Sequence, residues 1–154
     1  CGWELHAIMA SSRLITARRL RLQDSNVVVQ APPIPPNGYH IFLSHAWITG
    51  QDQMRVVKQR LLEMLPGVRV FLDVDDLQRK VGKGEQLLAQ SDKMLLFASD
   101  GVFGGSHPPS RPCMVELLKA IELGLEIVVV LDVESVHRSV TKEQLYEQMH
   151  SLDK

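Results

Sequence analysis

Polar and aromatic side chains gather directly after the first strand that this 154-residue sequence predicts. Ser44, His45 and Trp47 follow an apolar run that ends at Leu43. In open parallel sheets, ligands bind at the carboxyl ends of the strands. A hydroxyl, an imidazole and an indole at such an edge can contact a ribose, a phosphate and a flat base. We therefore interpret all three as candidate binding residues, although Trp47 equally suits an anchor packed on the domain.

Three carboxylates follow the second expected strand, at Asp73, Asp75 and Asp76. Such groups could bind Mg²⁺, and their spacing resembles the nucleophile motif of haloacid-dehalogenase-type phosphatases. That chemistry also needs a hydroxyl at a strand end and a lysine, for which Ser99 and Lys119 are the candidates. The phosphatase motif normally lies on the first strand of its fold, whereas another strand and helix precede it here. An Mg²⁺-dependent phosphatase using Asp73 and Asp75 is therefore a remote alternative.

Glu116 comes three residues after Cys113, at the expected start of a helix. A glutamate near a helix N-terminus is favourable by ~0.3–1 kcal/mol, and spacing alone favours this structural role. The same helix end lowers the pKa of a thiol, which would make Cys113 reactive. Because no His and Asn or Asp set accompanies it, a buried packing role is the better interpretation of Cys113.

Other motifs exclude several kinds of site. Gly82-Lys83-Gly84-Glu85 fails the spacing of a phosphate-binding P-loop, and no dinucleotide-binding glycine motif follows a strand. The six histidines show no metal-ligand spacing, so we expect no metal site. The Gly- and Pro-rich segment 101–109 suits a plain connector better than a lid.

Strand and helix signals alternate through the second part of the chain. The strands are continuous apolar runs, as expected for strands that are covered on both faces. This order predicts an α/β fold of the flavodoxin-like three-layer α/β/α type, with a four- to five-stranded parallel sheet. Strands are expected at 39–44, 68–72, 93–98 and 126–131; helices at 51–65, 84–90 and 113–123; and a last helix after a capping box at Thr141–Gln144.

A Pro-rich stretch at 31–38 divides the chain. Residues 1–36 form a basic segment and linker, the expected tail of a preceding domain, and include a short strand around Asn26–Gln30. Residues 37–154 form one domain. The net charge of −1 gives no general attraction to nucleic acid, and no apolar run reaches the ~20 residues of a membrane span. Two cysteines make no disulfide framework, which favours the cytoplasm.

Four stretches together resemble the TIR (Toll/interleukin-1 receptor/resistance protein) domain family. They cover its first strand and loop, its second strand and loop, its third strand, and the Cys-x-x-Glu-Leu that begins a helix. The loop after the second strand is especially similar to that of protist and algal TIR domains. The four stretches are Ile41–Trp47, Val70–Leu77, Leu95–Ser99 and Ser110–Leu117.

This resemblance implies intracellular signalling by one of two functions. Some TIR domains are scaffolds that assemble with other TIR domains, which here would use the loop from Asp73 to Lys83. Others, once assembled, hydrolyse NAD+ at the nicotinamide–ribose bond with one glutamate, which here is Glu116; NAD+ is then substrate, and no cofactor is implied. The substrate-binding residues implied are Ser44, His45, Trp47, Asp73, Leu77 and Cys113.

Two positions depart from the pattern of the active family members. A basic residue often stands where this chain has Ala46, and a tryptophan often stands where it has Pro112. A proline cannot stack on a base as an indole does. These departures favour the scaffold, whereas Glu116 and Cys113 favour the hydrolase. The family also has five strands, so the fifth would be absent or supplied by the segment around Val27–Val29.

Overall fold

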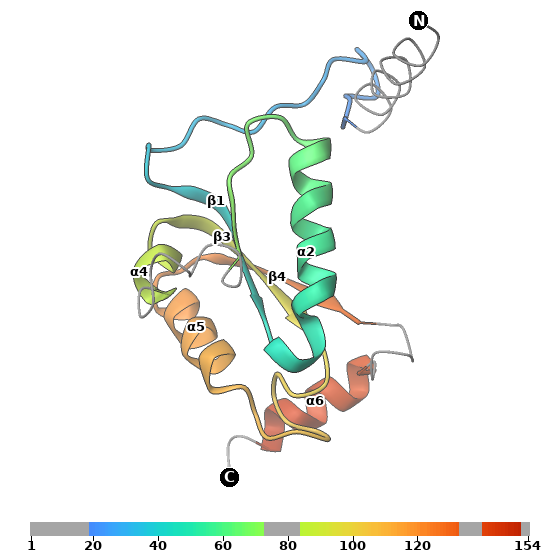
Figure 1. The fold of residues 1–154 in the computed structure, drawn as a ribbon, viewed down its shortest axis with the longest axis vertical. Helices are drawn as coiled ribbons and strands as arrows, with labels where there is room; N and C mark the ends of the chain where they lie inside the picture. Colours follow the sequence, from blue (N-terminus) through green and yellow to red (C-terminus); the bar gives the residue numbers. More distant parts are fainter. Residues whose placement is uncertain (1–18, 73–83, 133–139, 152–154) are drawn as a thin grey trace, which may run out of the picture.

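A four-stranded parallel sheet forms the centre of the domain in the computed structural model, which describes residues 19–72, 84–132 and 140–151 (Figure 1). The strands are β1 (Tyr39–His45), β2 (Val70–Leu72), β3 (Ser91–Ala98) and β4 (Glu126–Leu131). They lie in the order β2-β1-β3-β4, and all three strand pairs are parallel. This is the flavodoxin-like α/β architecture that the alternating sequence pattern predicts.

Helices cover both faces of the sheet and complete three layers (Figure 1). On one face, α2 (Trp47–Met64) packs through Met54 on Leu43, Leu72 and Phe97. On the other face lie α4 (Gly84–Leu88), α5 (Arg111–Glu122) and α6 (Lys142–Ser151). Successive residues of a strand point to opposite faces, so Phe42 belongs to this second core while Leu43 belongs to the first.

The helix boundaries confirm some local signals and correct others. The capping box is formed: the Thr141 hydroxyl accepts from the backbone N–H of Gln144 at 3.2 Å, and the Gln144 side chain accepts from the Thr141 N–H at 2.9 Å. Helix α2 begins at Trp47 rather than at Gln51. Its N-cap, Ala46, makes no side-chain cap, so the sequence held no capping signal for this earlier start.

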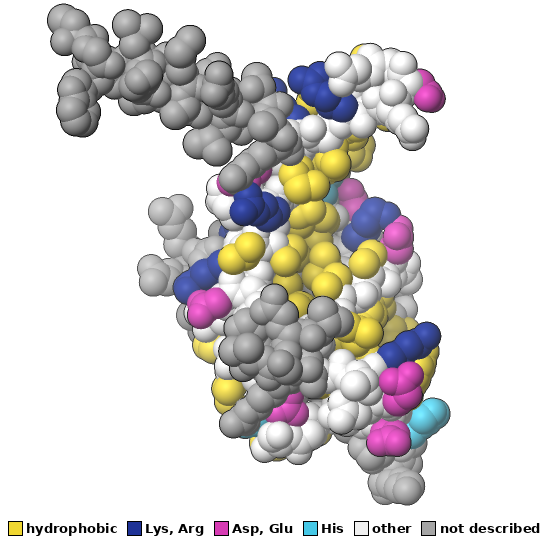
Figure 2. Space-filling model, turned by 90° about the vertical axis from the view of Figure 1, so that its right-hand side faces the viewer, with side chains coloured by type: hydrophobic (Ala, Val, Ile, Leu, Met, Phe, Trp, Pro, Cys, Tyr) yellow, Lys and Arg dark blue, Asp and Glu magenta, His cyan; other side chains and the backbone are white. Residues whose placement is uncertain are grey.

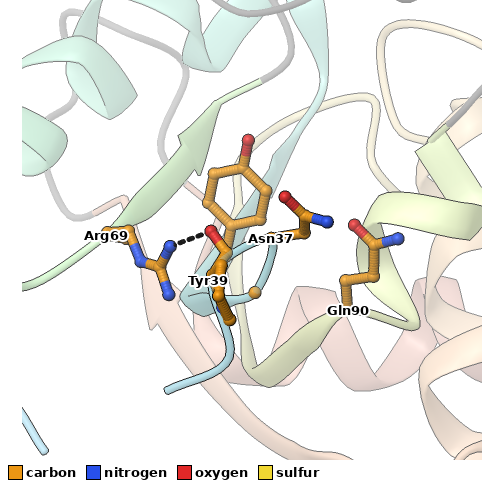
Figure 3. A pocket seen from close by; sticks show the side chains of 6 residues that line it. Asn37, Tyr39, Arg69 and Gln90 are labelled. Carbon is orange, nitrogen blue, oxygen red and sulfur yellow. Dashed lines mark hydrogen bonds between the residues drawn. The ribbon is translucent and has the colours of Figure 1, made fainter. Parts of the chain in front are cut away.

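The Pro-rich linker has no regular structure, as predicted, but it is bound to the amino edge of the sheet. The Arg69 guanidinium donates hydrogen bonds to the carbonyls of Ile34, Pro35 and Pro36. Beside it, His40 Nε2 lies 2.7 Å from the carbonyl oxygen of Pro32. A polar cavity of about 360 Å³ lies at this edge (Figure 3). Since Arg69 is committed to backbone carbonyls, we assign this region a structural role.

The prediction of a strand around Asn26–Gln30 is wrong. Val28 makes only an isolated antiparallel bridge with Arg21, after a turn at Asn26, whose φ is +55°. This segment takes no place in the sheet, so it does not supply a fifth strand. Within the described residues, β4 remains an edge strand with Val128 and Val129 exposed. The side of the molecule where α2 and β4 lie shows a band of hydrophobic side chains (Figure 2).

Candidate functional site

Ser44 and Glu116, which are 72 positions apart in the sequence, meet at the carboxyl edge of the sheet. The Ser44 hydroxyl, near the end of β1, donates a hydrogen bond of 2.6 Å to Oε2 of Glu116. Glu116 lies in the second turn of α5, and the first turn contains no acidic residue. Because the helix dipole acts mainly within the first turn, N-terminal stabilisation does not account for this glutamate. The contact that fixes the carboxylate in the structure is the hydrogen bond from Ser44.

Cys113 lies beneath this pair and supports it. The side chain is buried, and its thiol has hydrogen bonds with Ser110 and Ser44. Burial raises the pKa of the thiol, the negative charge of Glu116 raises it further, and the contacts with Ser110 and Ser44 offset this only in part. A buried thiol with a raised pKa is a poor nucleophile. Its burial in the core agrees with the packing role expected for Cys113.

His45 lies on the opposite face of the sheet from Ser44 and Glu116, because neighbouring strand residues alternate. Its Cβ faces Gly50 on α2, where an added methyl group would come within 3.0 Å of it. The ring is buried, and neither nitrogen has a hydrogen-bond partner among the described residues. Burial, followed by the positive charge of Arg55, lowers its pKa to about 4. The structure therefore does not bring His45 to the Ser44–Glu116 pair.

Trp47 stands at a pocket of about 220 Å³ between the first turn of α2 and the start of α5. Its side chain is 55% exposed, so it does not serve as a packed anchor. Apolar groups from two other segments complete the wall. The pocket is lined by Ala46, Trp47, Ile48, Asp100, Gly101, His107, Pro108, Ser110 and Pro112.

The pocket reaches the start of α5, the helix that carries Glu116. Pro112 lines the pocket four residues before Glu116 on α5. Residues at this spacing share a helix face and lie about 5–6 Å apart. Ser110 also lines the pocket and has a hydrogen bond with the Cys113 thiol, which in turn contacts Ser44. A ligand seated between Trp47 and Pro112 would therefore extend toward Glu116 over a short distance.

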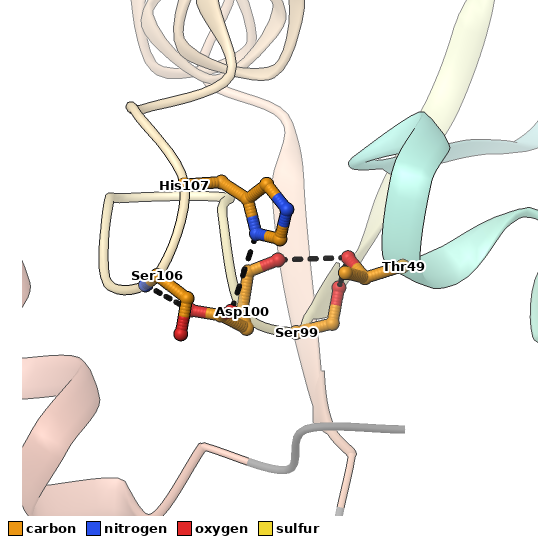
Figure 4. Close-up of polar contacts among 5 residues, drawn as sticks. All are labelled: Thr49, Ser99, Asp100, Ser106 and His107. Carbon is orange, nitrogen blue, oxygen red and sulfur yellow. Dashed lines mark hydrogen bonds and ion pairs between the residues drawn. The ribbon is translucent and has the colours of Figure 1, made fainter. Parts of the chain in front are cut away.

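A polar network beside the pocket was missed by the sequence reasoning (Figure 4). The Asp100 carboxylate accepts from the Ser106 backbone N–H at 2.9 Å and lies 3.4 Å from Nδ1 of His107. Thr49 Oγ1 lies 2.7 Å from Ser99 Oγ and donates to the Asp100 carbonyl at 2.8 Å. Burial raises the pKa of Asp100, but the hydrogen bonds from Ser106 and His107 lower it by more. The pKa of Asp100 is therefore below its ordinary value.

Two residues of this network, Ser106 and His107, lie in the Gly- and Pro-rich segment 101–109, for which the sequence favours a plain connector over a lid. Val102 and Phe103 are buried in the core that α4, α5 and α6 cover, which holds the segment against the domain. Gly105 has a φ of +105°, and an added Cβ there would overlap Asp100. The only advance signal was that Asp100 follows the expected third strand, where a parallel sheet binds its ligands.

Other predicted site residues remain outside this arrangement. Asp73 and Leu77, with Asp75 and Asp76, lie outside the described residues. Lys119 pairs with Glu122 at 3.0 Å on α5, and the phosphatase alternative stays a prediction. Among the residues that the structure describes, no cluster of His, Cys, Asp or Glu could hold a metal ion.

Comparisons with known proteins add no family assignment. A scan against protein-family models found no match for this chain, and a search of curated proteins also found none. In the described ranges, no helix combines the length and the apolar character needed to cross a bilayer.

Proposed function

We propose that this chain is a TIR-type domain of intracellular signalling that hydrolyses NAD+ at the nicotinamide–ribose bond, with Glu116 as the catalytic residue. The observation that carries the proposal is the 2.6 Å hydrogen bond between Ser44 and Glu116 beside a pocket of single-ring size. This hydrogen bond joins two of the four stretches that carry the family resemblance.

The chemistry requires one carboxylate beside the ribose. As the C–N bond breaks, its electron pair leaves with nicotinamide, which becomes neutral, and positive charge develops on the ribose. Glu116 stabilises this charge or attacks it, as carboxylates do in glycoside hydrolysis. Water then supplies the hydroxyl on the ribose carbon and releases a proton. Ser44 holds the carboxylate in place by donating to Oε2.

One of the two departures from the family pattern, Pro112, has a local compensation. Pro112 supplies no indole, but it lines the same pocket as Trp47, which projects from the start of α2. Aromatic stacking on a base contributes about 1–3 kcal/mol wherever the ring comes from. Trp47 can therefore supply the stacking surface that Pro112 lacks.

The direct test follows nicotinamide release from NAD+ by the purified chain. Glu116→Gln should reduce the rate by the ~10²–10⁴-fold typical of an essential acid–base or charge-stabilising group. Glu122→Gln is the matched control, because it removes an exposed carboxylate of the same helix and only its pair with Lys119. Full activity of the Glu116 variant, or no turnover by the unaltered chain at any protein concentration, would contradict the proposal.

Self-association without catalysis is the second candidate function, and one observation favours it. Val115, Leu118 and Ile121 form an exposed apolar stripe along α5. Such stripes mark protein contacts more often than single exposed apolar residues do. The adaptor alternative predicts concentration-dependent assembly in sedimentation experiments without NAD+ turnover. Leu118→Lys should weaken that assembly, and a monomer at all concentrations would exclude it. Contacts through the loop from Asp73 to Lys83 remain a prediction.

A further inference from the structure

We propose that His107, oriented by Asp100, recognises the amide group of the leaving base in the pocket. His107 would thus be a specificity-determining residue that selects an aromatic amide over the corresponding acid. This inference rests on the proposed cleavage of NAD+. It assigns a role to a residue that neither the family resemblance nor the proposed mechanism uses.

The first step is the placement of the imidazole. Its Nδ1 lies 3.4 Å from Oδ2 of Asp100, and the ring lines the pocket together with Trp47 and Pro112. The ring leans from its loop toward the first turn of α2, with Nδ1 turned to Asp100 and the other nitrogen directed away from it (Figure 4). Asp100 is itself fixed by the Ser106 N–H, so the imidazole has a defined orientation.

The second step is the hydrogen-bonding character that this orientation imposes. Asp100 is an ionised acceptor, since its pKa is lowered. An acceptor that faces Nδ1 favours the imidazole tautomer with its proton on Nδ1, and in that tautomer Nε2 is an acceptor. An amide NH₂ can donate to this nitrogen. A carboxylate has no proton to donate and also meets the negative charge of Asp100.

The third step is the size of the pocket. At about 220 Å³ it is smaller than the ~300–1,000 Å³ of sites that hold whole drug-sized ligands, so it suits one ring rather than a dinucleotide. Its place one helical turn from Glu116 puts that ring next to the reacting ribose. Of the two bases of NAD+, only nicotinamide is attached to that ribose, and only nicotinamide carries a carboxamide.

The test measures the binding of nicotinamide and of nicotinate to the full chain by ligand-observed NMR, without turnover. Nicotinamide should bind about tenfold more tightly than nicotinate. His107→Leu should remove most of this preference, whereas His107→Gln, which retains an acceptor, should keep part of it. His150→Leu, at an exposed histidine of α6, is the matched control. Trp47→Ala should weaken both ligands about equally, because stacking does not distinguish them.

The outcomes separate this inference from the proposed reaction. Glu116→Gln should abolish cleavage but leave nicotinamide binding unchanged. If the chain binds nicotinamide with the expected His107 dependence but cleaves no NAD+, the recognition inference stands and the reaction fails. If NAD+ is cleaved while His107→Leu keeps the tenfold preference, or if nicotinamide does not bind, the recognition inference is overturned.

Discussion

Two neighbouring polar residues at the end of β1 have opposite environments. Ser44 faces the α5 side of the sheet and donates to Glu116. His45 faces the α2 side, where its ring is buried and has no hydrogen-bond partner among the described residues. The pleat of the strand is the whole cause, because adjacent side chains must point to opposite faces. The polar contact with Glu116 therefore lies on the α5 face of the sheet. On the α2 face, the buried ring of His45 lowers the stability of the fold.

Replacing Ser44 should produce the largest effect in this comparison. Ser44→Ala removes a hydrogen bond to an ionised carboxylate, a contact worth about 1.5–3 kcal/mol. If that contact positions Glu116 for reaction, NAD+ cleavage should fall by about 10- to 100-fold. The fall should appear in kcat rather than in KM. An unchanged kcat in a folded variant would remove Ser44 from the positioning role.

His45 should dominate the acid sensitivity of the fold. Its pKa is about 4 in the folded chain against an ordinary value of 6.5, so the unfolded state binds more protons between these limits. Stability should fall as the pH drops from about 6.5 to 4, by about 2–3 kcal/mol from this group. Urea unfolding at a series of pH values measures this loss.

The control for this pH dependence is a pair of histidine variants. His45→Leu should flatten the loss and also raise stability at neutral pH, because it removes two buried ring nitrogens that lack partners. His150→Leu should change neither quantity by more than a few tenths of a kcal/mol. An acid loss that is the same with and without His45 would assign it to other groups.

Gly50 should give a smaller effect that tests how α2 approaches the sheet. An added Cβ would lie 2.9 Å from the Phe97 ring and 3.0 Å from Cβ of His45. Overpacking of this kind costs about 1–3 kcal/mol, which outweighs the ~1 kcal/mol that alanine contributes through helix propensity. Gly50→Ala should therefore lower the urea midpoint, while Gln59→Ala on the exposed side should not. A more stable Gly50→Ala would show that the helix can shift freely.

The sequence predicted the regular elements well because their periodicity carries the information. The bounds expected for β4 agree with the structure, and the capping box at Thr141 and Gln144 is formed as its spacing indicated. Strand alternation also held enough information to separate Ser44 from His45. We nevertheless grouped them as one binding set, and that grouping was wrong in geometry.

The Asp100–His107 contact was beyond the reach of periodicity. It depends on a segment whose glycines at 101, 104 and 105 all have positive φ, and no repeating pattern specifies such a path. The start of α2 at Trp47 was also not predictable from the sequence, because Ala46 gives no capping signal. The Asp100–His107 contact and the start of α2 both shape the pocket. The sequence therefore predicted the part of the candidate site at Ser44 and Glu116 better than it predicted the pocket.

The attachment of the linker by Arg69 has a practical consequence. The carbonyls that it binds lie at the amino edge of the sheet, whereas Ser44 and Glu116 meet at the carboxyl edge. A dimerising module attached through the linker would raise the local concentration of two domains while both pockets stay accessible. Enforced dimerisation through the linker would then test whether the proposed NAD+ cleavage depends on the proximity of two domains.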